Sequence, residues 1–170
     1  MTKQLHRVYT VGYSGSSHED LRQYIKALNA RLVDIRFSPR SRAAMWDGRA
    51  IAQAVGSHSY EHMRAFGNTN YNNGGPIQIA DFRSGCQQVR AMLEKHAVIL
   101  MCVCQDWEEC HRRIVADQLA TVLGVEVEHL PGRFAVWKGG QAERPVFGEA
   151  DPAHYRLPTS ARHNHGKGQV

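Results

Sequence analysis

Three of the four cysteines lie within nine residues, at Cys102, Cys104 and Cys110, and the last of them is followed by His111 and Arg112. A cysteine acts as a nucleophile in its thiolate form, which nearby positive charge and the amino end of a helix both favour. The apolar pattern predicts that a helix begins at Cys110. Cys102, Cys110 and His111 are therefore candidate catalytic residues for nucleophilic or acid–base chemistry. The sequence leaves open the alternative that Cys110 packs as a small apolar residue and that the arginines are surface charges.

The same segment offers four soft metal ligands, which are Cys102, Cys104, Cys110 and His111. The period of a strand would direct Cys102 and Cys104 to one face. Their spacing departs from the paired Cys-x2-Cys pattern of common zinc sites, so these residues are weak metal candidates and the sequence predicts no metal. It requires no cofactor and leaves the cofactor unknown. We expect Cys86 to lie in the core.

A second group of polar residues surrounds Pro39 and forms a loop rich in hydrogen-bond donors, which suits phosphate or carboxylate. Asp34 precedes this loop and is a further catalytic candidate, because a carboxylate there could orient an arginine or act as an acid or base. The candidate anion-binding residues are Tyr13, Ser14, Arg36, Arg40, Ser41, Arg42 and Arg112. The alternative for the loop is a solvated basic segment without a ligand.

Strand and helix patterns alternate along the chain. Strands are expected at 7–11, 31–36, 97–103 and 125–130, and helices at 16–29, 81–96 and 110–123, with a weaker helical pattern at 43–55. The spacing of Ser16 and Glu19 predicts a capping box at the start of the first helix. The uninterrupted apolar run at 97–103 is typical of the centre of a parallel sheet. These patterns predict an α/β fold, Rossmann-like, with a mostly parallel sheet and helices on both faces.

In such a sheet, ligands bind beyond the carboxyl ends of the strands. We therefore expect the turns at 12–15, 36–42 and 102–113 to meet at one site. The domain organisation is predicted as one α/β domain at 1–150, with an irregular loop insertion at 67–76 and a basic, flexible tail at 151–170.

The composition, with 42% hydrophobic and 22% charged residues, is that of a globular protein. No apolar run approaches the roughly 18–20 residues that cross a membrane, and no signal-peptide pattern is found. We therefore expect a cytoplasmic protein without a membrane partner. The net charge of +5 favours polyanions only weakly, and the oligomeric state stays open.

Four successive motifs resemble the family called domain of unknown function 488 (DUF488). They are Thr10–Ser14, Val33–Ser41, Leu100–Cys102 and Cys110–Arg113, and the resemblance spans about 8–130. It implies a Rossmann-like α/β domain and supplies no settled activity. Where the family usually has a glutamate two residues after its first cysteine, this chain has Cys104.

Two functions are compatible with these residues. The first is an enzyme that acts on a phosphate-bearing substrate, a nucleotide or nucleic acid, with a Cys/His/Arg site. The second is a non-catalytic module that binds the nucleic-acid backbone, for which steep salt dependence is expected. A third, weaker reading is redox or metal sensing by the cysteines.

Overall fold

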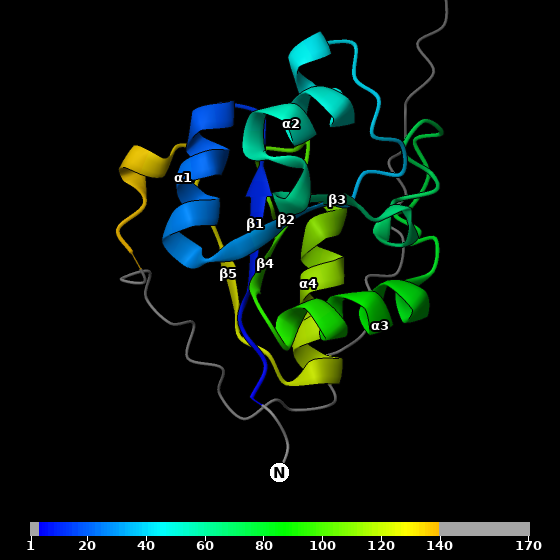
Figure 1. The fold of residues 1–170 in the computed structure, drawn as a ribbon. Coiled ribbons are helices and arrows are strands. Elements are labelled where there is room, and N and C mark those ends of the chain that lie inside the picture. The colour runs from blue at the N-terminus through cyan, green and yellow to red at the C-terminus, as the bar shows by residue number, and fades with distance from the viewer. Residues whose placement is uncertain (1–3, 140–170) are drawn as a thin grey trace, which may run out of the picture. The chain divides into compact units, whose positions relative to one another are not determined.

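The six residues of strand β4 (Ala97–Cys102) are all buried, and this strand is the middle one of a five-stranded sheet. The computed structural model describes residues 4–139. The strand order is β3-β2-β4-β1-β5, and all four strand pairings are parallel (Figure 1). The other strands are β1 (Val8–Gly12), β2 (Ala30–Asp34), β3 (Tyr60–His62) and β5 (Val127–His129). The predicted central position of the apolar run is confirmed.

Helices cover both faces of the sheet (Figure 1). They are α1 (His18–Leu28), α2 (Gly48–Val55), α3 (Phe82–Leu93) and α4 (His111–Leu123). Alternate residues of β4 face opposite ways, because successive side chains of a strand point to opposite faces. Val98 and Leu100 pack with α3 and α4, whereas Ile99 and Met101 pack with α1 and α2. The predicted Rossmann-like α/β fold is thus confirmed.

Two local predictions are wrong. Strand β3 is absent from the expected strands, because its three half-buried residues at the sheet edge carry no apolar run. The capping box of α1 is formed by Ser17 and Asp20, one residue later than predicted. The amide of Ser16 instead donates to the carbonyl of Tyr13 at 2.9 Å, so Ser16 closes the preceding turn.

Outside the sheet, residues 67–80 contain a single antiparallel bridge, between Asn68 and Ile79, and are otherwise turns, bends and irregular backbone. The predicted tail at 151–170 lies outside the described residues, and the predicted domain limits stay a prediction. No helix within residues 4–139 combines the length and apolarity that a membrane span needs.

Candidate functional site

The loops that follow β1, β2 and β4 meet at the carboxyl edge of the sheet. The amide of Tyr13 donates to the carbonyl of Cys102 at 2.9 Å, and the amide of Ser14 donates to that of Val103 at 3.1 Å. The ring nitrogen Nε2 of His111, the first residue of α4, lies 2.9 Å from the carbonyl of Ile35. The first turn of α4 is thereby joined to the loop after β2.

Three thiols and one imidazole gather at this edge. The Nδ1 atom of His111 lies 3.5 Å from Sγ of Cys102 and 4.0 Å from Sγ of Cys110. Cys102 and Cys110 are buried, whereas Cys104 is exposed. Cys102 and Cys104 were expected on one face of a strand, but β4 ends at Cys102, so Cys104 lies in the next loop. Cys86 is buried in the core, as predicted.

The thiols influence one another's protonation. Hydrogen bonds from the thiols of Cys102 and Cys110 lower the pKa of Cys104 to about 2, and the charges of Arg112 and His111 add to this. The same hydrogen bond to Cys104 raises the pKa of Cys102 to about 11, and contacts with both other thiols raise the pKa of Cys110. These shifts favour a thiolate at the exposed Cys104 over a thiolate at Cys102 or Cys110.

His111 and the helix terminus complete the cluster. Burial alone would lower the pKa of His111, but the hydrogen bond and charge of Cys110 raise it. Cys110 is the N-cap of α4, and its sulfur accepts a hydrogen bond from the amide of Arg112 at 3.5 Å. As predicted, α4 begins at Cys110 and His111, and the positive end of its dipole faces the sulfurs.

Arg112 is a fully buried cation, with 1% of its surface exposed. It donates to the carbonyls of Cys104 and Gln105, while its Nε finds no hydrogen-bond partner among the described residues. Within residues 4–139 no carboxylate lies within 4.0 Å of it. A buried charge is costly without an opposite charge. Arg112 is also one of the positive charges that lower the pKa of Cys104.

Asp34 and Arg36 form a buried pair beside this cluster. Nε and one terminal nitrogen of Arg36 donate to the carboxylate of Asp34 at 2.8 and 2.5 Å, and the hydroxyl of Tyr60 donates to it at 2.7 Å. The remaining donors of Arg36 reach the carbonyls of Trp46 and Pro39 and the hydroxyl of Tyr13. All five N–H groups of the guanidinium are therefore used inside the protein. In this arrangement the pair fixes the loop after β2 and offers no donor to a ligand.

The other predicted anion-binding residues lie nearer the surface. Arg40 and Arg42 are exposed, and Ser14 and Ser41 are half-buried. Neither arginine forms an ion pair with an acid of residues 4–139. Tyr13 is buried, with its ring stacked on Trp46 at 4.5 Å between centroids. Arg40 and Arg42 are thus the predicted arginines whose charges face solvent.

Sequence reasoning missed two residues that hold the loop carrying Cys104. The ring of Trp107 stacks on that of His129 with centroids 3.9 Å apart, and Nδ1 of His129 lies 2.7 Å from the hydroxyl of Thr10. Burial, with the charges of Arg112 and Arg113, lowers the pKa of His129 to about 4, so the ring is neutral near pH 7. A tryptophan in an otherwise polar turn between two cysteines was the available signal.

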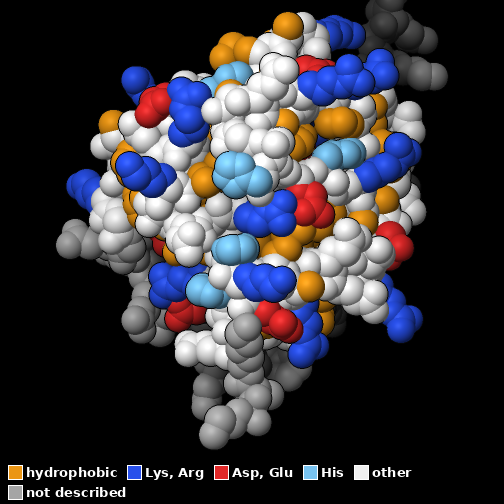
Figure 2. Space-filling view, in the orientation of Figure 1, with side chains coloured by type: hydrophobic (Ala, Val, Ile, Leu, Met, Phe, Trp, Pro, Cys, Tyr) orange, Lys and Arg blue, Asp and Glu red, His pale blue; other side chains and the backbone are white. Residues whose placement is uncertain are grey.

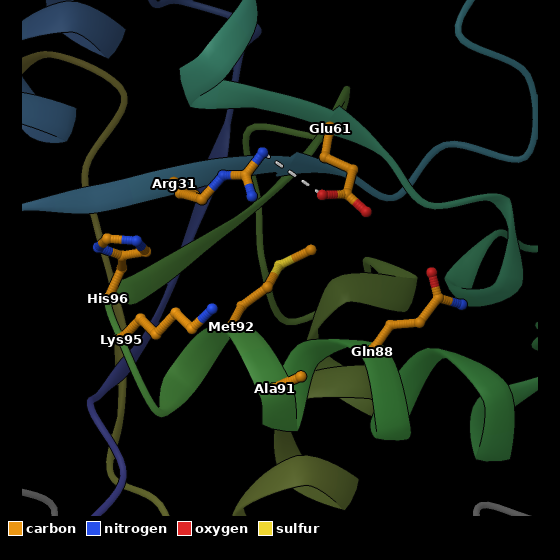
Figure 3. Close-up of a pocket in the computed structure, with 7 residues that line it drawn as sticks. All are labelled: Arg31, Glu61, Gln88, Ala91, Met92, Lys95 and His96. Atoms are coloured by element: carbon orange, nitrogen blue, oxygen red, sulfur yellow. Dashed lines mark ion pairs between the residues drawn. The ribbon is translucent and has the colours of Figure 1, made fainter.

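A hollow of about 430 Å³ lies elsewhere, between β2, β3 and α3 (Figure 3). Its lining residues are Arg31, Glu61, Gln88, Ala91, Met92, Lys95 and His96. Arg31 and Glu61 form an ion pair across it at 3.5 Å. None of the thiol-cluster residues lines this hollow. On the face seen in Figure 2, Lys and Arg side chains are scattered among acidic and neutral ones and form no continuous stripe.

The chain is a Rossmann-like domain with a parallel sheet. A cysteine–histidine cluster lies at the carboxyl end of its central strand. The sequence profile of the family described as Domain of unknown function DUF488 matches residues 76–119, which include α3, β4 and the whole cluster. The resemblance to that family is confirmed over this stretch. Comparisons with curated proteins and with solved structures gave no match.

Proposed function

We propose that this protein is an enzyme that acts on a small phosphate-bearing substrate, such as a nucleotide, with Cys104 as its nucleophile. The observation that carries the proposal is an exposed thiol beside two buried thiols, an imidazole and a buried guanidinium that has no carboxylate partner among residues 4–139. The residues that position Cys104 and stabilise the negative charge of its thiolate are Cys102, Cys110, His111 and Arg112.

The reaction begins with attack by the sulfur of Cys104 on an electrophilic atom of the substrate. A bond forms between sulfur and that atom, and the leaving group departs with the bonding electron pair and takes a proton from water. A second water molecule then displaces the thiolate and loses a proton to solvent. The thiolate is regenerated, so no oxidant or reductant is consumed.

Phosphate recognition is assigned to the exposed part of the neighbouring loops. Arg40 and Arg42 extend from the loop after β2, and Ser14 and Ser41 add hydroxyl donors. On the face seen in Figure 2 the scattered charges form no continuous basic stripe, which a long nucleic-acid backbone would need there. Because all four cysteines are free, we also infer that the protein works in a reducing compartment such as the cytoplasm.

Turnover of a panel of nucleotides and phosphate esters tests the proposal. We expect Cys104→Ser to reduce turnover by at least about 10³-fold, because a hydroxyl is a far weaker nucleophile than a thiolate. Cys86→Ala is the matched control, since this thiol lies in the core on α3, and it should keep full activity.

Removal of both exposed arginines, in Arg40→Ala/Arg42→Ala, should raise KM more than it lowers kcat. The control is Arg90→Ala, an exposed arginine in the last turn of α3, at the opposite edge of the sheet. Wild-type turnover in Cys104→Ser would overturn the proposal. So would oligonucleotide binding that falls steeply with salt and ignores the cysteine substitution, which would instead support a binding module.

A further inference from the structure

The orientation of the His111 ring is that of a metal ligand. Its Nε2 lies 2.9 Å from the carbonyl of Ile35, which can only accept a hydrogen bond, so in the neutral ring Nε2 carries the proton. The lone pair of Nδ1 then faces the sulfurs of Cys102 and Cys110. Metal-bound histidines nearly always donate their second ring N–H in this way, which fixes both the tautomer and the ring.

The distances between the candidate ligand atoms are close to those of a tetrahedral site. The sulfurs of Cys102 and Cys110 and a ring nitrogen of His111 all lie within 4.8 Å of one another. Around a zinc ion with bonds of about 2.0–2.3 Å, ligand atoms are separated by roughly 3.3–3.8 Å. Small side-chain rotations therefore suffice to bring three ligands onto one ion.

Cys104 supplies the fourth ligand. It follows Cys102 by two residues, in the loop whose carbonyl at Cys104 accepts a hydrogen bond from Arg112, and it is the exposed member of the group. An ion can therefore enter from solvent at Cys104 and reach the buried ligands behind it. Arg112 is buried and has no carboxylate partner in the described part of the chain, so it is placed to balance the net negative charge that three thiolates give to a divalent ion.

We propose that Cys102, Cys104, Cys110 and His111 form a four-coordinate site for one soft divalent ion of the Zn²⁺ type, and that its occupancy masks the Cys104 nucleophile. Cys104 binds as the thiolate, any ligand thiol that is still protonated gives its proton to solvent as it binds, and no electron is transferred. The spacing of the ligands in sequence is uncommon for zinc, but the loop at 103–109 returns the chain to the same edge. The inference shares its site with the proposed function and does not require that function to be correct.

Titration of reduced, metal-free protein with Co²⁺ tests the site directly. We expect the intense near-ultraviolet absorption of sulfur-to-cobalt charge transfer and the visible bands of a tetrahedral ion, at one ion per chain. Cys104→Ser should weaken binding at least about tenfold, and it keeps the core intact because Cys104 is exposed. Cys110→Ser should behave likewise, and Cys86→Ala should bind as the wild type does.

Absence of thiolate bands with Co²⁺, or wild-type affinity in both Cys104→Ser and Cys110→Ser, would overturn the metal site. Turnover of the metal-free enzyme is measured separately, and addition of Zn²⁺ should suppress both turnover and alkylation of Cys104. Turnover without Co²⁺ binding would support the proposed function and overturn the metal site. Co²⁺ binding without turnover would support the metal site and overturn the proposed function.

Discussion

Replacement of Asp34 by alanine is expected to lower the free energy of unfolding by about 3–5 kcal/mol, because it leaves a buried cation without its partner. Asp34 is fully buried, and Arg36 beside it is 5% exposed. The carboxylate also accepts a hydrogen bond from the hydroxyl of Tyr60, and this hydroxyl would lose its acceptor in the variant. Urea denaturation of the purified variant, followed by circular dichroism, measures the change.

The exposed acid Glu109 provides the matched control. Glu109→Ala should change the free energy of unfolding by no more than about 0.5 kcal/mol, as is usual for surface positions. A loss below about 1 kcal/mol in Asp34→Ala would mean that the buried pair does not hold the loop after β2, since a buried charge left unpaired costs more.

The second large effect is expected at Gly12, the last residue of β1. A Cβ atom at this position would lie 1.8 Å from the carbonyl oxygen of Cys104. That oxygen belongs to the backbone and is held by Arg112, so it cannot turn away as a flexible side chain would. Gly12→Ala should therefore displace the loop of Cys104 and destabilise the protein by about 3 kcal/mol or more, at the upper end of overpacking effects.

Thermal denaturation and turnover are the two measurements for this variant. Gly75→Ala is the control, since its new Cβ would meet only the side chain of Asn70, at 3.4 Å, in an exposed loop. Wild-type stability with wild-type turnover in Gly12→Ala would contradict the close approach of the β1 and β4 loops.

Most of the fold could be predicted from local patterns. The apolar run of β4 identifies the centre of the sheet, and the apolar face of α4 identifies the helix that follows this strand. Parallel strands carry their carboxyl ends at one edge, so the meeting of the three loops was predictable from the alternation of strands and helices. Strand β3 was not predicted, because an edge strand of three polar or half-buried residues shows no periodic pattern of apolar residues.

The chemistry of the site was harder to predict, because it depends on which groups each side chain contacts and on whether it is exposed. Whether Arg36 faces a ligand or the protein is decided by Asp34 and by the carbonyls of Trp46 and Pro39, which lie up to ten residues away. The exposure of Cys104 follows from the end of β4 at Cys102, and element boundaries are the least predictable part of a fold.

Alkylation of the native, reduced, metal-free protein by iodoacetamide, mapped over time by mass spectrometry, tests the central role of Cys104 most directly. We expect Cys104 to be modified at least about tenfold faster than Cys86, Cys102 or Cys110, because it is the exposed thiol and reactivity follows exposure and thiolate character. Modification of Cys104 at the same rate as the three buried thiols, or later than them, would contradict the account.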